Sequence, residues 1–399
     1  MRLLSGLCGL AALARALAAA PTTAAPPAVT RRPVAAGTGA GGVISAATAV
    51  RGVFYLLPAR GGSHALTTYD PAAGWGTIPV PASVPVMDML DGPSFTGVEA
   101  VHAGLDDFVV VSGGGTNHVV YYNVRTKTWA AAPPMRNAQK NACATSCRGF
   151  WYSMTGDMAK QAGEERAEHD DDDDDDDDEG MRKPQGILKP QDRQVYRYNF
   201  TSGEHFENSG KKQRGGAGCG CDPLANRVIW EGGSSNSGLS DNVECWGADP
   251  LHRGGEPIFK ATGARRDVGA VACGGLFVGV GGSNSKQHAL SSVDVFTANS
   301  SDPSGGHVAL DLGVAVTKPR VACLAGRFVL VSGGHVDGGK AVDTTVHVLD
   351  THASPLAFGV LPGGVLANVT GEVFAATDVQ SGSVLFFDGK VGELMTLSN

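Results

Sequence analysis

The side chains best suited to recognise another molecule are arginines in the loops that lead into predicted apolar strands. Five of them are candidate binding residues: Arg136, Arg214, Arg265, Arg266 and Arg320. A guanidinium is a planar fork of five N–H donors, and its shape matches a carboxylate. If the fold brings these arginines to one surface, they predict binding to an acidic protein partner. The alternative is that they hydrogen-bond loop carbonyls and never meet a ligand.

The strongest charge feature is a run of nine aspartates, Asp170–Asp178, which Glu179 extends to ten negative charges. The formal net charge is -8, so the rest of the chain holds 32 basic and 30 acidic residues and is nearly neutral. This balance argues against nucleic acid as the main partner. Such dense like charge repels itself, so we expect an insertion over residues 158–193 to be disordered. The alternative role of the insertion is solubility alone.

No catalytic or metal-binding constellation is recognisable in the sequence. Gly-x-Ser-x-Gly, His-Glu-x-x-His and P-loop patterns are missing, and so are paired catalytic carboxylates. Several histidines fall in or beside predicted strands and turns, where ordinary hydrogen bonding is expected: His102, His118, His288, His335 and His347. The aspartate run has no EF-hand-like spacing that would organise a cation site. The sequence therefore predicts a binding protein rather than an enzyme, with no cofactor and no metal.

The eight cysteines become seven if an N-terminal segment containing Cys8 is removed. The groups Cys143-x3-Cys147 and Cys219-x-Cys221 can form disulfides in an oxidising compartment, although an odd count leaves one thiol unmatched. Zinc is not indicated, because no second CxxC or histidine cluster accompanies them. Three cysteines end short apolar strands, and we expect them to be small buried thiols: Cys147, Cys273 and Cys323.

The N-terminus indicates targeting. Residues 1–20 combine Arg2, an apolar stretch and small residues, which is typical of a secretory signal peptide. An organelle transit peptide is the alternative, because no Asp or Glu precedes Asp70. Residues 21–42 are rich in Pro, Ala and Thr, and we expect them to be disordered. No later stretch is long and apolar enough to span a membrane. Three sequons give weak support for a secreted glycoprotein: Asn199, Asn299 and Asn368.

The elements that must position these residues are short strands. With 56 glycines and only 18% charged residues, the chain is predicted to be all-β and rich in tight turns. In residues 107–135, the apolar run Phe108–Val111 meets three glycines, and a second run, Val119–Tyr122, follows. Such a pair of runs predicts a hairpin. The stretch then continues to Trp129, seven residues beyond Tyr122.

A di-glycine after a strand, followed by this Tyr and Trp, resembles a kelch repeat. The motif residues are Gly113, Gly114, Tyr122 and Trp129, with further di-glycines at Gly232-Gly233, Gly281-Gly282 and Gly333-Gly334. Glycine suits a sharp backbone turn that approaches a neighbour closely, and the aromatic pair is expected to pack between adjacent sheets. The repeat is about 50 residues long. The marker glycines recur near that interval, apart from one gap of 76 between Gly156 and Gly232 that contains the acidic insertion: Gly61, Gly113, Gly156, Gly232, Gly281 and Gly333.

The resemblance implies a kelch-type β-propeller over residues 43–399, with seven four-stranded blades and six as the alternative. Seven strand–turn–strand units support it: Ala46–Leu57, Val98–Gly114, Ala142–Gly156, Gly218–Gly233, Val268–Gly282, Pro319–Gly334 and Leu366–Asp378. The last unit lacks the di-glycine, and we expect Val384–Phe387 to be its third strand.

In a four-stranded meander, the loops that lead into inner strands emerge at the same end of the blade as the loops between strands two and three. The arginines and the acidic insertion would then share one face, within reach of electrostatic attraction. We therefore expect the insertion to cover this face in part and to compete with an acidic partner. In kelch propellers, arginines at this position often line the ligand face.

A secreted enzyme of the galactose-oxidase-like propeller group is the alternative. That group uses a Tyr-His pair and a further His as copper ligands in its C-terminal half. Here the last tyrosine is Tyr198, and no Tyr-His dipeptide occurs. Copper-radical chemistry therefore lacks a ligand, while carbohydrate binding without that chemistry stays open.

Overall fold

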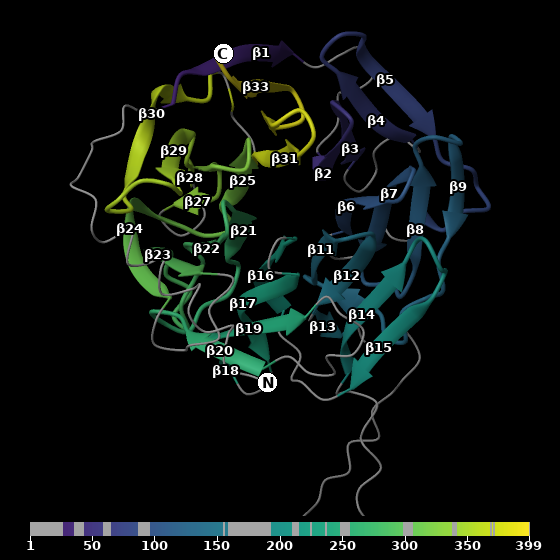
Figure 1. Ribbon diagram of the computed structural model, residues 1–399, viewed down its shortest axis with the longest axis horizontal. Coiled ribbons are helices and arrows are strands. Elements are labelled where there is room, and N and C mark those ends of the chain that lie inside the picture. Colours follow the sequence, from purple (N-terminus) through teal and green to yellow (C-terminus); the bar gives the residue numbers. More distant parts are fainter. Residues whose placement is uncertain are drawn as a thin grey trace, which may run out of the picture.

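The structure is a computed structural model that describes residues 27–35, 44–58, 65–86, 96–154, 156–158, 193–209, 215–223, 226–235, 238–247, 256–297, 306–336, 341–367, 369 and 372–398. Seven sheets of antiparallel strands stand as blades around a central axis (Figure 1). The inner strands of successive blades contact one another around the ring, and the last blade contacts the first. The chain is thus a seven-bladed β-propeller, as predicted. Among the described residues, no helix is long and apolar enough to cross a membrane.

Each blade runs from an inner strand at the axis to an outer strand at the rim, and the strands are named here in that order. The first four blades are β2 (Ile44–Val50), β3 (Val53–Pro58), β4 (Ala65–Asp70) and β5 (Gly74–Pro79); β6 (Thr96–Ala103), β7 (Asp106–Gly113), β8 (Val119–Asn123) and β9 (Thr128–Ala131); β11 (Cys143–Cys147), β12 (Phe150–Met154), β14 (Arg193–Asn199) and β15 (His205–Ser209); and β16 (Gly215–Asp222), β17 (Arg227–Ser235), β19 (Asn242–Gly247) and β20 (Glu256–Lys260).

The last three blades follow the same plan, with one exception at the end of the chain. They are β21 (Gly269–Cys273), β22 (Leu276–Val280), β23 (Leu290–Thr297) and β24 (His307–Val316); β25 (Arg320–Leu324), β26 (Phe328–Ser332), β29 (Thr345–Asp350) and β30 (Phe358–Val365); and β31 (Phe374–Asp378), β32 (Ser383–Phe387), β33 (Val391–Leu397) and β1 (Val29–Ala35). The exception is β1, which comes from the opposite end of the chain.

Two faces of the ring follow from this meander. Strands one and two, and strands three and four, are joined on one face, which we name the hairpin face. The loops between strands two and three, and the crossovers to the next blade, lie on the other face, which we name the crossover face. Short strand pairings extend the loops on the crossover face. They are β10 (Gln139–Lys140) with β13 (Asp157–Met158), β27 (His335–Val336) with β28 (Ala341–Val342), and β18 (Gly238–Leu239) with β17.

Strand β1 closes the ring and corrects two expectations. It pairs with β33 from Val29 opposite Leu397 to Ala35 opposite Val391, so residues 29–35 of the segment predicted to be disordered form a strand. Pro33 is tolerated because the strand is at the edge of its sheet. The seventh unit is also shifted. Residues Leu366–Asp378 do not form a strand pair, and the pair is instead β31–β32. The predicted third strand, Val384–Phe387, lies in β32 and is therefore the second strand. The blade still has four strands because β1 supplies the fourth.

Tight turns shape the hairpin face. Arg51 and Gly52 between β2 and β3 both have positive φ, 52° and 81°, and Arg148 and Gly149 between β11 and β12 repeat this at 49° and 82°. Two consecutive positive φ angles are the mark of a two-residue turn that matches strand twist. A two-residue turn fixes the register of the strand pair, so β2 is locked to β3 and β11 to β12.

The marker di-glycines are explained by close approach between blades. Gly232, Gly233, Gly281, Gly282, Gly333 and Gly334 all have positive φ. A Cβ on Gly232 would lie 2.6 Å from the carbonyl oxygen of Arg265, and one on Gly282 would lie 2.6 Å from that of Arg266. Only glycine allows the second strand of a blade to meet the next crossover loop this closely.

The apolar core lies between adjacent blades. Tyr122 and Trp129 of blade 2 are in contact, with ring centroids 5.4 Å apart, and both join a cluster with blade 1 residues such as Tyr55 and Leu66. The Trp129 indole Nε1 donates to the carbonyl oxygen of Pro79 (3.1 Å). The expectation that this aromatic pair packs between neighbouring sheets is confirmed.

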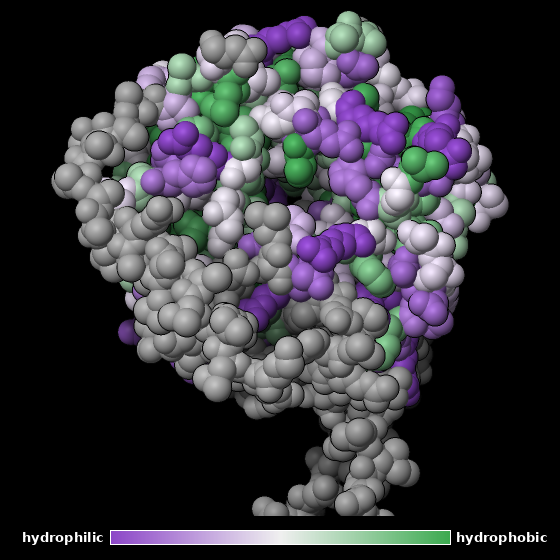
Figure 2. Space-filling model, in the orientation of Figure 1, coloured by the Kyte–Doolittle hydropathy of each residue, from purple (hydrophilic) through white to green (hydrophobic). Residues whose placement is uncertain are grey.

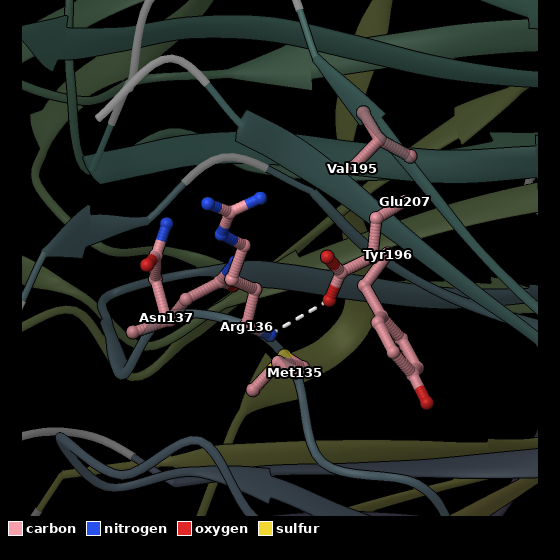
Figure 3. A pocket seen from close by; sticks show the side chains of 7 residues that line it. Met135, Arg136, Asn137, Val195, Tyr196 and Glu207 are labelled. Carbon is pink, nitrogen blue, oxygen red and sulfur yellow. Dashed lines mark hydrogen bonds between the residues drawn. The ribbon is translucent and has the colours of Figure 1, made fainter. Parts of the chain in front are cut away.

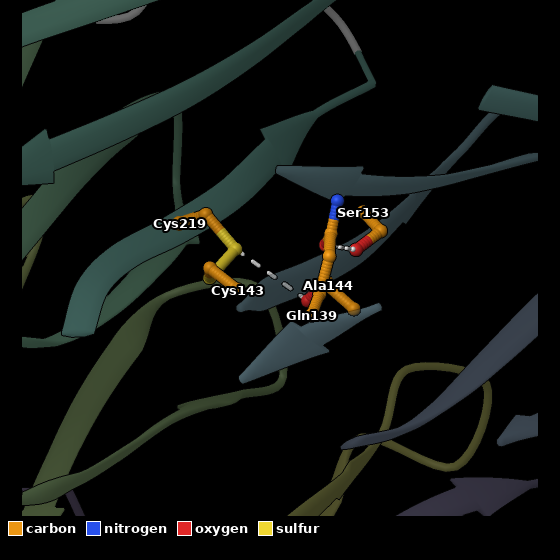
Figure 4. The surroundings of a disulfide bond; sticks show 5 residues. All are labelled: Gln139, Cys143, Ala144, Ser153 and Cys219. Carbon is orange, nitrogen blue, oxygen red and sulfur yellow. Dashed lines mark hydrogen bonds between the residues drawn. A yellow bond between two sulfur atoms is a disulfide. The ribbon is translucent and has the colours of Figure 1, made fainter. Parts of the chain in front are cut away.

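Three disulfides link inner strands of different blades. Cys143–Cys219 and Cys147–Cys221 join β11 to β16, and Cys273–Cys323 joins β21 to β25; the first is shown in Figure 4. The prediction of unbonded thiols at Cys147, Cys273 and Cys323 is wrong, because the inner strands pass each other with Cα–Cα distances of 5.6 Å and 5.5 Å, which suit disulfide geometry. Of the cysteines in the described part of the chain, Cys245 is free and buried.

Candidate functional site

The crossover face holds the four predicted arginines that the structure describes, and its loops are tied together by backbone hydrogen bonds. The loop after a second strand bonds to the crossover loop that leads into the next blade. Gly233 N–H donates to the Arg265 carbonyl (2.8 Å), Ser283 N–H to that of Arg266 (2.8 Å), and His335 N–H to that of Thr317 (2.9 Å). The expectation that the two kinds of loop share one end of the propeller is confirmed.

Arg265 is not a surface residue, which corrects its prediction as a contact for a partner. Its side chain is fully buried (0% exposed), and its guanidinium forms ion pairs with Glu231 on β17 and Asp294 on β23, both also fully buried. Its Nη1 donates to the carbonyl oxygen of Ser292 (2.9 Å). The sequence placed Arg265 in the correct loop, but it did not show that the side chain turns inward between blades 4 and 5.

The Arg265 network includes further partners of Asp294. Thr262 donates to Asp294 Oδ1 through its hydroxyl (2.5 Å) and its N–H (3.0 Å), and His307 Nε2 lies 2.5 Å from the same oxygen. Burial raises the pKa of Glu231 above its usual value, and the Arg265 charge opposes this rise. A buried charge without a partner is strongly unfavourable, so this network holds the seam between blades 4 and 5 and is not available for binding.

Arg320 is also occupied by its surroundings. Its Nε donates to the carbonyl oxygen of Val373 (2.9 Å), and Nη2 pairs with Glu372 (2.7 Å). The guanidinium carbon lies 4.6 Å from the centre of the Phe374 ring. The alternative interpretation, in which these arginines hydrogen-bond loop carbonyls, therefore holds for Arg320, which joins blade 6 to blade 7.

Arg136 lies beside a small recess between blades 2 and 3 (Figure 3). Its backbone N–H donates to Glu207 Oε1 (2.7 Å), while its exposed guanidinium extends away from that carboxylate. Tyr196 lines the same recess, and its hydroxyl donates to the carbonyl oxygen of Pro133 (2.6 Å). The recess has a volume of only about 10 Å³, which is close to the size needed for one water. Arg136 is thus a surface cation and not part of a ligand cavity.

Arg266 remains exposed, with 41% of its side chain accessible, and its Nε lies 3.6 Å from Asp267 Oδ2. Arg214 and the run Asp170–Asp178 lie outside the described residues. Of the five predicted arginines, the structure thus leaves Arg136 and Arg266 on the surface and buries or occupies Arg265 and Arg320. It does not bring these four described arginines together.

The other predicted residues have ordinary local roles where they are described. His102 Nδ1 lies 2.5 Å from Asp107 Oδ1, and His347 Nε2 lies 3.1 Å from Asp343 Oδ2. Asn199 Oδ1 accepts from Thr201 N–H (2.8 Å) in a turn on the hairpin face. Asn299 and Asn368 lie outside the described residues. Within the described part of the chain, no group of three or more His, Cys, Asp or Glu residues could hold a metal ion.

Sequence reasoning missed Arg51, which lies at the centre of the hairpin face. It occupies the first position of the two-residue turn between β2 and β3, where φ is 52° and Asn, Asp or Gly is preferred. A long cationic side chain at a turn position that favours Asn, Asp or Gly is the sequence feature that could have identified Arg51 as a candidate. The hollow at the centre of the ring can be followed in the space-filling view (Figure 2).

Comparison with known proteins supports the fold and no more. No family model matches the chain, and none of the curated proteins matches it in sequence. A solved structure of YjhT is similar with a TM-score of 0.53 and 11% identity, covering 80% of this chain and 97% of that one. A chain in a mitotic checkpoint complex is similar with a TM-score of 0.54 and 12% identity, covering 96% of both chains. At such low identity, these likenesses show the β-propeller architecture alone.

Proposed function

We propose that this chain is a kelch-type propeller that acts as a binding module for an acidic protein partner and not as an enzyme. The kelch assignment is supported by the di-glycines at blade junctions and by the Tyr122–Trp129 contact. The proposed contact surface is the basic patch, defined as Arg266, Lys286 and Lys318 on the crossover face of blades 5 and 6. Lys286 and Lys318 are exposed, and 41% of the Arg266 side chain is accessible.

The observation that carries this proposal is the link between two consecutive crossover loops. Lys318 N–H donates to the carbonyl oxygen of Asp267, the residue after Arg266, at 2.9 Å. This bond holds the two cationic residues on adjoining loops. Arg266 contacts Asp267 at a distance of 3.6 Å, so its other donors remain available to a carboxylate. The loop that contains Lys286 is joined to Arg266 through Ser283.

The cysteines support a proposal for the cellular compartment. Three disulfides between blades are consistent with an oxidising environment, because such bonds persist in secreted proteins and are rare in reducing compartments. We therefore propose that the chain works in the secretory pathway or outside the cell, where its partner would be found.

The test compares two neutralised variants against a labelled oligo-glutamate peptide, with binding followed by fluorescence anisotropy at low salt. We expect Arg266→Gln with Lys318→Gln to weaken binding roughly 2- to 30-fold, because each surface charge contributes ~0.2–1 kcal/mol. Lys127→Gln is the matched control, since Lys127 is exposed on the hairpin face and has a similar backbone φ of 58° against 52° for Lys318. Equal weakening in both variants, or none in the double variant, would show that the basic patch is not the contact surface.

A further inference from the structure

A second surface, on the hairpin face at the mouth of the central channel, is built differently from the basic patch. A hollow of about 500 Å³ opens there, lined by Arg51 and Gly52 from blade 1 and by Asp378, Gln380 and Ser381 from blade 7. We name these residues together with His102 the channel mouth. It is independent of the proposed function, because it lies on the opposite face from the basic patch.

Buried carboxylates hold exposed donors at the channel mouth. Asp107, whose side chain is 5% exposed, accepts from Arg51 Nε and contacts His102 Nδ1 at 2.5 Å. The Arg51 side chain is 55% exposed and that of His102 is 38% exposed. Among the described residues, no acceptor is bound to the two Nη atoms of Arg51. Because Asp107 takes the inner edge of the guanidinium, the outer edge keeps two parallel donors, which is the arrangement that holds a carboxylate in a bidentate manner.

The turns of three blades meet at this mouth. Asp378 is fully buried and accepts from Gly52 N–H (2.8 Å) and Ser381 N–H (3.0 Å), so it fixes the turn of blade 7 against that of blade 1. From the same blade 7 turn, Gln380 Nε2 comes within 3.5 Å of His102 Nδ1 of blade 2. Donors from blades 1, 2 and 7 are therefore gathered in one place and supported by buried acids.

Apolar side chains stand on the adjoining turns. Leu105, in the turn between β6 and β7, is 84% exposed, and Val379, in the turn between β31 and β32, is 76% exposed. These are the two most exposed of the large apolar side chains in the described part of the chain. Exposed apolar groups beside a charged centre are typical of a surface that binds a protein or peptide.

We propose that the channel mouth binds a peptide carboxylate flanked by apolar side chains, with the carboxylate on the outer edge of Arg51 and the apolar groups against Leu105 and Val379. The carboxylate could belong to a C-terminus or to an acidic side chain, which present the same chemistry. A cationic ligand is the competing outcome, because Asp378 Oδ1 is buried and has no hydrogen-bond partner among the described residues.

The experiment measures anisotropy with four dye-labelled peptides rich in leucine, using the full chain. One has a free C-terminal carboxylate, the second is amidated, the third is amidated with an internal glutamate, and the fourth is amidated with an internal lysine. We expect the first or third to bind at least 10-fold more tightly than the second, and the stronger of them identifies the source of the carboxylate. Preference for the lysine peptide, or equal affinity for all four, would overturn the proposal.

Two variants locate the site. We expect Arg51→Gln to weaken carboxylate binding by roughly 10- to 100-fold, the range for charged hydrogen bonds. Arg148→Gln is the matched control, because Arg148 has the same turn position in blade 3, with φ of 49°, and its Nε donates to the carbonyl oxygen of Pro223 (2.9 Å). Leu105→Ser leaves the Arg51–Asp107 pair intact, and we expect it to weaken binding about 3-fold through lost apolar contact. Unchanged affinity in both Arg51→Gln and Leu105→Ser would refute the assignment, and thermal melts would show that the variants are folded.

Discussion

The ring is held together by different chemistry on its two sides. Between blades 3 and 6, two seams carry disulfides and the seam between them carries the buried Arg265 network. Between blades 7, 1 and 2, a hydrogen bond from Gly52 N–H to Asp378 and an ion pair between Arg51 and Asp107 join the turns. On the first side, the side chains of Arg265, Glu231 and Asp294 are fully buried, while the second side ends in the exposed donors of Arg51 and His102.

This difference shows how stability and binding are divided around one ring. A disulfide or a fully buried ion network uses all of its bonding capacity inside the protein. At the channel mouth, Asp107 uses one edge of the Arg51 guanidinium and leaves the other edge at the surface. The side without disulfides is therefore the side where a contact between blades can also serve a ligand.

The largest expected effect comes from removing Arg265. We expect Arg265→Met to reduce the free energy of unfolding by about 3–5 kcal/mol, because Glu231 and Asp294 would be left as buried charges without a partner. Equilibrium unfolding in guanidinium chloride measures this. Arg266→Met, at the exposed neighbour, should change stability by no more than about 0.5 kcal/mol. If the two variants were equally stable, the conclusion that the buried Arg265 network stabilises this side of the ring more than the surface residue Arg266 does would be wrong.

A somewhat smaller effect is expected from the disulfide between blades 5 and 6. The double variant Cys273→Ala with Cys323→Ala should lose about 2–4 kcal/mol, because the bond closes a chain segment with a sequence separation of 50. Thermal unfolding without reductant measures the loss. Cys245→Ala, which removes the buried free thiol, is the control and should cost less. Alkylation of the unreduced, denatured chain offers a direct check, since modification at Cys273 or Cys323 in the parent protein would contradict the bond.

The smallest expected effect depends on pH and belongs to the seam between blades 2 and 3, which has no disulfide. Burial raises the pKa of Glu99 to about 8, while a hydrogen bond from the Ser146 backbone opposes the rise. The folded chain therefore keeps a proton that the unfolded chain loses above its ordinary pKa of 4.5. The contribution of Glu99 to the free energy of unfolding is complete below pH 4.5 and is lost as the pH rises through about 8.

Thermal melts from pH 5 to pH 9 measure this loss, which we expect to be on the order of 1 kcal/mol because Glu99 is only half-buried. Glu99→Gln should flatten this part of the profile, and Glu204→Gln, at an exposed glutamate on the hairpin face, should leave it unchanged. A profile that is the same in parent and Glu99→Gln would mean that this seam does not respond to pH through Glu99.

Much of the blade architecture could be predicted from local sequence. The run Phe108–Val111, its glycines and the following Val119–Tyr122 correspond to β7 and β8, because strand propensity and turn chemistry act over a few residues. The di-glycines recur because each blade must meet the next crossover loop without a Cβ. The seventh blade was displaced by one strand, since its outer strand comes from residues 29–35 and pairs across the length of the chain.

The candidate sites were less predictable. Arg265 and Arg266 are neighbours in sequence, yet one is fully buried and the other is 41% exposed. Their difference depends on Glu231 and Asp294, which come from two other strands. Arg51 was not predicted as a functional residue, because its partner Asp107 is in another blade.

By itself, the sequence determined the all-β class and the repeat of about fifty residues, and it favoured seven blades over six, since these rest on patterns that a short segment contains. Only the tertiary structure decided which strand closes the ring, which cysteines pair and which arginines face solvent. The physical reason is that these outcomes depend on side chains from separate blades meeting at a seam, and a one-dimensional pattern does not state which blade edges face each other or how close they come.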